Sequence, residues 1–477
     1  MKRGRLYPLS ILALALVAGG FLRFYRLDAF EMSADEGASW AAAAAPSLSA
    51  VLRAQVVLNP GKAGLHDLAL HLWMRAFGDG LSAMRALSAV AGTLAVALVF
   101  LLTRETFAPP SGADESAAPL PAEARDLAAA LAALLFAVNL VMVKYAREAR
   151  MYPLEIDAVI GAAYCVICGM NRGGWIWPAL AAICAALAIA AHLTALAALG
   201  AIGLWLLYIF LQAQGGAKSA ATSARRALGN LAALAAGAAL LAPLAPAVIG
   251  SAAHAAAIGA IGWIKRPAWW APFALFNKAA GTFAFPVYAA LAGWGAIRCW
   301  RQARDRVLFA LIWMWAPPTV VLAASYILEP LFMERYLIAV FVPFFMLAAL
   351  GIVAIESRPS RGLALGLALT LALGHLWAWS RKAHDVQWRE AAMAARYRCA
   401  AGEAIVVAPG YADNVVRYYL RGLKDGPRVI PVNKAAGSDA RVAILGDAGV
   451  APEVAARVRA EYPRVVARDR GVVVRER

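Results

Sequence analysis

Long apolar runs, separated by short polar or charged segments, make up most of this chain. A transmembrane helix needs about 17–25 predominantly apolar residues, and eleven runs meet that requirement. The longest apolar stretch, residues 175–211, exceeds one crossing, and the polar residues His192 and Thr194 divide it into two. The pattern predicts a polytopic all-α membrane protein with spans at residues 6–22, 81–103, 127–143, 154–170, 175–191, 195–211, 228–248, 280–297, 307–325, 336–355 and 363–379.

The final part of the chain, from residue 380, follows a different pattern. Short β-rich runs alternate with helical stretches, which is typical of a small α/β domain outside the membrane. The β-rich runs cover residues 404–407, 429–432, 442–445 and 472–474. We therefore predict two domains: a transmembrane domain over residues 1–379, with a first outer loop at 23–80, and an α/β domain over 380–477.

Basic residues between the spans indicate the orientation. They are concentrated in loops that share a side with the N-terminus, and this excess marks the cytoplasmic side. Because the number of spans is odd, the α/β domain is expected on the outer side. The N-terminal run has no clear small-residue cleavage site, so we expect an uncleaved span. The basic residues are Arg3, Arg5, Arg172, Lys218, Arg225, Arg226, Arg298, Arg301, Arg304, Arg306, Arg358 and Arg361.

Composition supports the membrane assignment and limits the partners. The 477 residues are 62% hydrophobic, whereas soluble domains average about 45–50%. The net charge of +17 arises mostly in the loops, without an aromatic-basic module. We therefore expect membrane-lipid or phosphate ligands and no nucleic acid. Cys165 and Cys168 form a C-x-x-C pair within an apolar run, which is more typical of small buried residues than of a zinc or redox site.

Two adjacent carboxylates, Asp35 and Glu36, follow the first span. Ser33 and Glu36 have the spacing of a capping box, so one interpretation is that the acids only cap a short helix that stops near Pro46. A capping box needs Glu36 alone, however. Asp35, kept ionised near the positive end of the helix dipole, could accept a proton from a hydroxyl nucleophile.

Residues 65–77 predict a helix that lies in the membrane interface. Asp67, His71 and Arg75 recur at helical spacing and form its polar stripe. For His71 and Arg75, the plain interpretation is a stripe turned to solvent or to lipid headgroups. His66, at the start of the helix, could face the two acids or lie at the surface.

A second charged segment, residues 144–152, falls on the outer side, where the positive-inside rule disfavours cations. Snorkelling toward the interface is the plain interpretation of an isolated cation there. Lys144, Arg147 and Arg150 have only Glu148 as a local partner, however. Because arginine offers a bidentate fork to phosphate, we expect an anionic, phosphate-bearing ligand at this segment.

The remaining polar groups of the outer side have plain interpretations too. His192 could simply lie in a polar turn between two spans. Lys265 and Arg266 could belong to an interfacial aromatic belt. Glu334 and Arg335 could pair with each other. Taken together, however, acids and cations on one side indicate a site in which cations hold a phosphate leaving group and a carboxylate activates a hydroxyl. The rival function is a transporter or flippase of a lipid-linked anionic substrate, which predicts charges near mid-span and repeated broken helices.

Several motifs jointly resemble the GT-C glycosyltransferases, in the branch of protein O-mannosyltransferases and ArnT-like aminoarabinose transferases of lipid A. Residues 147–152, Arg-Glu-Ala-Arg-Met-Tyr, are similar to a signature of that family. The resemblance covers residues 15–355, and it departs from the family at Asp67 and Ala69, which replace the prolines usual after His66. Further matching motifs are Asp35-Glu36, His66-Asp67-Leu68-Ala69, Phe77-Gly78, Arg85-Ala86-Leu87-Ser88, His192-Leu193-Thr194 and Arg335-Tyr336.

The resemblance implies a GT-C glycosyltransferase of the bacterial inner membrane that acts at the periplasmic face. It would move a hexosyl or pentosyl group from a polyprenyl phosphate to a hydroxyl of a lipid, glycan or protein of the cell envelope, as in lipid A or glycan modification. It also implies inversion at the anomeric carbon, with Asp35 as general base and Glu36 assisting. The sequence requires no cofactor, although Asp35, Glu36, His66 and His192 are candidate ligands for a divalent cation. The expected donor-phosphate ligands are Arg147, Arg150, Lys265, Arg266 and Arg335, and the other site candidates are His66, Tyr152, His192 and Tyr336.

Overall fold

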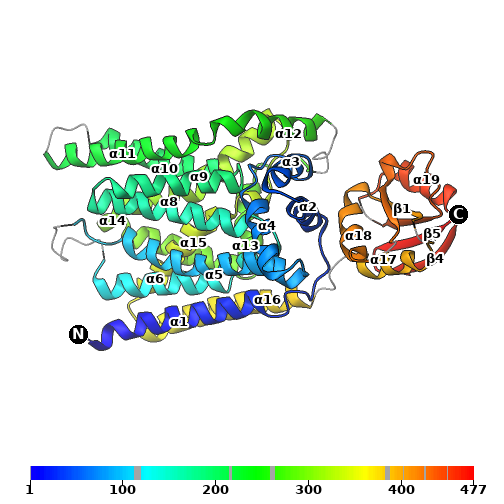
Figure 1. Ribbon diagram of the computed structural model, residues 1–477. Helices are drawn as coiled ribbons and strands as arrows, with labels where there is room; N and C mark the ends of the chain where they lie inside the picture. Colours follow the sequence, from blue (N-terminus) through cyan, green and yellow to red (C-terminus); the bar gives the residue numbers. More distant parts are fainter. Residues whose placement is uncertain are drawn as a thin grey trace. The chain divides into compact units, whose positions relative to one another are not determined.

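The computed structural model contains two compact units (Figure 1). The bundle unit comprises Met1–Tyr25, Pro60–His66 and Arg85–Arg381. The mixed unit comprises Arg26–Asn59, Asp67–Met84 and Lys382–Arg477, so most of the first loop belongs with the C-terminal region. The structure describes residues 2–111, 120–213, 218–257, 264–381, 387–400, 402–423, 426–447 and 449–477.

The bundle unit is built from apolar helices, and the predicted polytopic fold is confirmed. Within the described residues, seven helices are long and apolar enough to cross a membrane, or eight if the bent pair α6–α7 is counted as one span. Each of the eleven predicted runs falls largely on helical residues. Eleven runs exceed the seven or eight long helices partly since α14 carries two runs and the short apolar helices α9 and α15 carry one each. The helices are α1 (Lys2–Phe24), α5 (Leu81–Thr106), α6 (Ala122–Ala137), α7 (Leu140–Ala146), α8 (Tyr152–Arg172), α9 (Ile176–Ala191), α10 (Ala195–Gln212), α11 (Lys218–Ala239), α12 (Ala245–Ala257), α13 (Ala271–Ala280), α14 (Phe285–Ile327), α15 (Phe341–Val353) and α16 (Arg358–Ser380).

Helix α14 is two helices joined at a break. Ala303 has non-helical backbone angles, φ −138° and ψ 38°. The Trp315 ring lies 5.1 Å from Phe273 and 5.2 Å from Phe276, both on α13, which directly precedes α14. A straight helix would carry Trp315 about 45 Å away from Phe285 at 1.5 Å per residue. The chain therefore turns back at Ala303, as the two predicted spans over this region require.

Glycines allow α14 and α15 to pack closely. A Cβ added at Gly295 would lie 2.2 Å from the Leu347 carbonyl oxygen, and one at Gly351 would lie 1.9 Å from that of Leu291. Only glycine permits backbones to approach to this distance. Such contacts between small residues replace the hydrophobic driving force that is missing between helices in lipid. Helix α15 is accordingly buried along almost its whole length.

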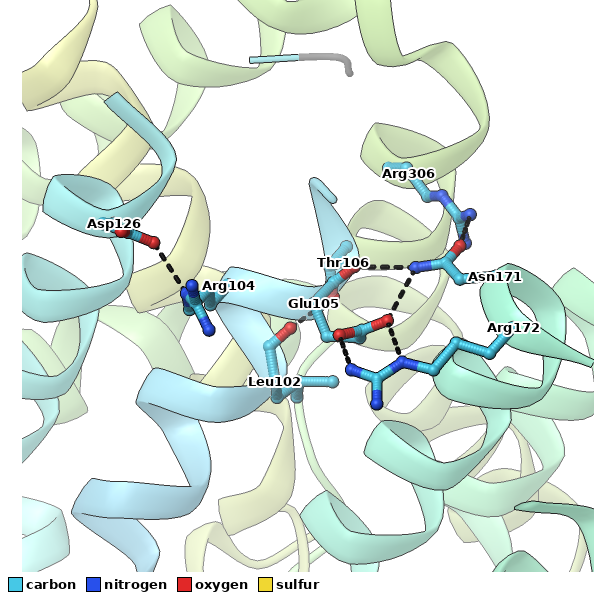
Figure 2. A network of polar contacts seen from close by, with 8 residues as sticks. All are labelled: Leu102, Arg104, Glu105, Thr106, Asp126, Asn171, Arg172 and Arg306. Atoms are coloured by element: carbon cyan, nitrogen blue, oxygen red, sulfur yellow. Dashed lines mark hydrogen bonds and ion pairs between the residues drawn. The ribbon is translucent and has the colours of Figure 1, made fainter. Parts of the chain in front are cut away.

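One end of the bundle is closed by a polar network around Glu105 (Figure 2). Its carboxylate accepts hydrogen bonds from Arg172 Nε at 3.1 Å and Asn171 Nδ2 at 3.2 Å, and it also pairs with Arg172 Nη2. Arg306 donates to Asn171 Oδ1. Beside this network, Arg104 pairs with Asp126 at 2.7 Å. These contacts join helices near the loops that the sequence places on one side of the membrane, and we call this region the Glu105 end.

The C-terminal part of the mixed unit is the predicted small α/β domain. Its five-stranded sheet has the order β2-β1-β3-β5-β4, parallel through β2-β1-β3 and antiparallel at β5 and β4. Strands β1 and β3 are buried along their whole length, which explains their continuous apolar sequence. The edge strand β4 is partly exposed along its length, and the sequence analysis did not predict it. The elements are α17 (Trp388–Arg396), β1 (Ala404–Ala408), α18 (Asp413–Leu420), β2 (Arg428–Pro431), β3 (Val442–Gly446), α19 (Pro452–Glu461), β4 (Arg464–Asp469) and β5 (Val472–Glu476).

The first loop contributes α2 (Ala34–Ala43), α3 (Leu48–Leu58) and α4 (Leu65–Phe77). The bounds of α4 match the predicted helix, but its polar stripe does not face solvent throughout. Asp67 and His71 are buried, and His71 Nδ1 lies 2.7 Å from the carbonyl oxygen of Ala43. The apolar side chains of Leu72 and Phe77 are exposed instead. The interpretation of His71 as part of a stripe facing solvent or headgroups is therefore wrong.

Candidate functional site

The candidate site in the bundle unit begins where a transmembrane helix breaks. Helices α6 and α7 meet at an angle of 60°. Asn139 stabilises the break because its Oδ1 accepts the N–H groups of Val141 at 3.0 Å and Met142 at 3.3 Å, while its Nδ2 donates to the carbonyl of Ala279 at 2.9 Å. A helix N-cap of this kind replaces the hydrogen bonds that the break removes. The short helix α7 then leads into the charged segment 147–150.

Arg147 and Arg150 have different surroundings. Arg147 Nη1 donates to the carbonyl oxygens of Leu22 at 2.9 Å and Tyr25 at 2.7 Å, so this guanidinium closes the C-terminal end of α1. Burial, and then the nearby charge of Arg85, lower the pKa of Arg147 to about 10. The backbone of Arg150 is held by α5, because its carbonyl oxygen accepts a hydrogen bond from Ser88 Oγ at 2.9 Å.

His192 lies at the centre of a buried polar group between α9 and α10. It is 8% exposed, and its Nδ1 accepts the backbone N–H of Thr194 at 3.2 Å. The Thr194 hydroxyl lies 2.5 Å from the same nitrogen and donates to Glu155 Oε1 at 2.9 Å. Acceptance of the Thr194 N–H by Nδ1 favours the neutral tautomer with its proton on Nε2. His192 and Thr194, which divide the apolar stretch in the sequence, are thus joined directly in the structure.

Two tyrosines flank the imidazole. The Tyr336 ring stacks on His192 with centroids 5.2 Å apart, and the Tyr152 ring lies 6.1 Å from it. Tyr336 follows Arg335, whose guanidinium carbon lies 5.5 Å from the centre of that ring. The structure therefore brings together four of the predicted site residues: Tyr152, His192, Arg335 and Tyr336.

Positive charge surrounds His192. Burial lowers the pKa of His192 well below its usual value, and the charges of Lys62, Arg150 and Arg335 lower it further. All three act in the same direction, so the local potential is positive. Lys62 and Arg150 are only 4% and 5% exposed. We call Lys62, Arg150, His192 and Arg335 the cationic cluster.

Lys62 was missed by the sequence analysis. It is a single lysine in the first loop, three residues before α4, and it belongs to the bundle unit although most of that loop belongs to the mixed unit. Neither charge spacing nor a motif distinguishes it from a surface lysine. Only its burial distinguishes Lys62 from a surface lysine, and burial cannot be read from the sequence.

The two acids lie in the first turn of α2, in the mixed unit. The predicted capping box is confirmed: Ser33 Oγ accepts the N–H of Glu36 at 3.2 Å, and Glu36 Oε2 accepts the N–H of Ser33 at 2.9 Å. Glu36 is 1% exposed, whereas Asp35 is partly exposed. The two neighbouring carboxylates are therefore in different situations, and Glu36 alone serves the cap.

His66 is buried at the start of α4, whereas Lys265 and Arg266 are exposed in an irregular segment before α13. Glu334 forms an ion pair with Lys278 at 2.5 Å. Among the described residues, no group of three or more His, Cys, Asp or Glu side chains is placed to hold a metal ion.

Comparison with known proteins adds evidence on the fold. No family model and no curated protein matches the chain. The crystal structure of ArnT from Cupriavidus metallidurans bound to undecaprenyl phosphate is similar over 98% of this chain and 97% of that one, with a TM-score of 0.64 and 14% identity. The oligosaccharyltransferase of Archaeoglobus fulgidus, tethered with an acceptor peptide, matches 92% of this chain and 69% of its own, with a TM-score of 0.58 and 12% identity.

A third similar structure is AglB of Archaeoglobus fulgidus, an oligosaccharyltransferase in complex with an inhibitory peptide and a dolichol-phosphate. It covers 96% of this chain and 70% of its own, with a TM-score of 0.57 and 12% identity. At these identities the likeness concerns the fold. The predicted GT-C fold, an apolar helical bundle with a small C-terminal α/β domain, is confirmed.

Proposed function

We propose that this protein is a membrane glycosyltransferase that moves one sugar from a polyprenyl phosphate to an acceptor hydroxyl. The observation that carries this proposal is the cationic cluster. Buried cations are costly in a membrane protein and mark functional sites, and a positive potential around a neutral histidine suits an anionic group. The similar fold bound to undecaprenyl phosphate supports a lipid-linked phosphate as that group.

In the proposed reaction the phosphate is the leaving group. As the bond between the anomeric carbon and the phosphate oxygen breaks, negative charge develops on the phosphate, and Lys62, Arg150 and Arg335 stabilise it. His192 contributes a hydrogen bond from Nε2–H without adding a charge. Arg147 has a positioning role, because its guanidinium is already engaged with the end of α1.

Asp35 is the proposed general base. It accepts the proton of the acceptor hydroxyl as the oxygen bonds to the anomeric carbon, so the products are a glycoside, a polyprenyl phosphate and a protonated Asp35. Attack opposite the departing phosphate inverts that carbon. Glu36 holds the helix start through its capping box and does not take part in proton transfer. The acceptor is a lipid, glycan or protein hydroxyl, and the site faces the periplasm of a bacterial inner membrane, as the positive-inside rule favours.

The variant Asp35→Asn tests this role. The amide keeps the size of the side chain but cannot take the proton, so the transfer rate should fall by about 10²–10⁴-fold. The measurement is complementation of a deletion strain, with mass spectrometry of envelope glycans and lipid A to detect the missing sugar. Glu36→Gln, which keeps an acceptor for Ser33, is the matched control.

Binding of undecaprenyl phosphate to the purified variant, in the same detergent as the wild type, should be unchanged. Full complementation by Asp35→Asn would remove this residue from the mechanism. It would then favour a flippase, which needs the cations but no base.

A further inference from the structure

The short segment before α2 is attached to the C-terminal domain. The backbone N–H of Met32 donates to the hydroxyl of Tyr419 at 3.0 Å. Glu31 Oε2 accepts the backbone N–H of Arg389 at 2.9 Å, in the first turn of α17. The first N–H groups of a helix have no partner within it, so a carboxylate at this position is a favourable cap. Both contacts lie within four residues of Asp35 in the sequence.

The same domain also packs against α2 itself. A Cβ added at Gly37 would lie 2.9 Å from Val415 Cγ2 and 3.1 Å from the Val415 nitrogen, so Gly37 lets α2 touch the start of α18. One turn further along, the Trp40 ring meets Tyr418 edge-on, with centroids 5.3 Å apart. Two helical positions of α2, Gly37 and Trp40, and the segment just before its cap are thereby held by one domain.

A second attachment holds the other end of the loop. Arg421 Nε pairs with Asp79 Oδ2 at 2.7 Å, and its guanidinium lies 3.6 Å from the centre of the Tyr418 ring. The Tyr418 hydroxyl donates to the Asp79 carbonyl oxygen at 3.2 Å. Tyr418 therefore touches both parts of the first loop, near Trp40 and near Asp79.

We propose that α18, with the N-terminus of α17, is a positioning element that fixes the orientation of α2 and hence of the Asp35 carboxylate. This inference rests on the proposed role of Asp35. A base that is displaced by about 1 Å can lose about 10²-fold in rate, and a short helix in a long loop is not stable by itself. The C-terminal domain supplies the missing rigidity, which gives it a function in a reaction whose other residues lie on the first loop and the bundle.

Three variants test the proposal, each with a matched control. Tyr419→Phe removes the hydroxyl that holds Met32, and Tyr397→Phe removes one from an exposed ring of the same domain. Glu31→Ala removes the acceptor for Arg389, whereas Glu31→Gln retains one. Arg421→Asp breaks the contact with Asp79, and the exchanged pair Asp79→Arg with Arg421→Asp restores an opposite-charge contact.

Two readouts separate positioning from general stability. Hydrogen exchange of residues 31–43 in the full-length protein should become faster in Tyr419→Phe, Glu31→Ala and Arg421→Asp, and remain near wild type in the controls and the exchanged pair. In the same loosened variants kcat should fall by about tenfold or more, with the donor KM unchanged, because the base is misplaced while phosphate binding is intact.

Unchanged exchange over residues 31–43 in all three loosened variants would overturn the proposal, and so would faster exchange with an unchanged kcat. These outcomes differ from failure of the proposed function. That failure is an active Asp35→Asn variant, whatever the exchange rates show.

Discussion

The two ends of the bundle unit both collect cations, but they use them differently. Helix α8 connects the ends: Tyr152 at its start touches His192, and Arg172 at its end pairs with Glu105. Its 21 residues place these points about 30 Å apart. At the Glu105 end, the carboxylate and the amide of Asn171 take up the hydrogen bonds of Arg172 and Arg306 (Figure 2). Around His192, burial lowers the pKa of the imidazole, and the charges of three cations lower it further.

The comparison shows why counting arginines is a poor guide to function. The Glu105 end has more arginine in its sequence, yet the contacts described there join one helix to another. Arg226, for example, donates to the carbonyl of Met170 at 2.8 Å and so closes the end of α8. The cationic cluster is the better candidate for a ligand-binding site, because its charges act together on a buried neutral ring.

The strongest test of the difference between the two ends is to remove one arginine from each. Arg150→Ala should raise the donor KM by about 10- to 100-fold, since a hydrogen bond to a charged group contributes about 1.5–3 kcal/mol. Arg172→Ala, the matched control at the other end, should leave the donor KM unchanged. Steady-state kinetics with varied donor concentration measure both. Equal effects of the two substitutions would contradict the distinction between the ends.

A substitution at Glu105 tests whether this end contributes to stability and not to donor binding. Glu105→Gln keeps one acceptor but loses the charge that pairs with Arg172, and it should cost about 1–2 kcal/mol of stability. The melting temperature in detergent should fall by a few degrees, and kcat and the donor KM should not change. A change in donor affinity without a change in melting temperature would mean that the Glu105 end takes part in binding.

The smallest effect concerns pH and His192. The pKa of this imidazole is lowered in the folded protein, so between its folded and unfolded pKa values only the unfolded chain binds the proton. Stability should therefore fall as pH drops below the usual histidine range near 6.5. Thermal unfolding at pH 7.5 and pH 5.5 should show a smaller loss for His192→Asn than for the wild type. An identical loss in both proteins would show that the ring is protonated in the folded state as well.

Much of the architecture could be predicted from apolar pattern and local chemistry. The runs of apolar residues locate the spans because lipid requires long apolar helices with internal hydrogen bonds. The capping box at Ser33 and the turn at His192 were also predictable, since each depends on residues close together in the sequence. The sequence analysis missed the break at Asn139, because this residue lies within a single apolar run. Its role as a helix cap is seen only once the structure shows that the helix changes direction there.

The candidate site itself was only partly predictable. Arg147 and Arg150 belong to one motif, and nothing in their spacing reveals that one guanidinium binds the end of α1. Likewise, no local signal connects Lys62 with His192, which lies 130 residues later. These assignments depend on which distant segments the fold brings together.

The sequence by itself determined the membrane class, the positions of the apolar helices, the α/β character of the last hundred or so residues and the short capped helix beside the two acids. These features follow from hydrophobic burial and from hydrogen bonds between near neighbours. The tertiary structure alone decided that Lys62 joins the cationic cluster and that Gly37 packs on Val415. Electrostatic fields and close packing depend on distances through space, and the order of residues along a chain does not contain those distances in a readable form.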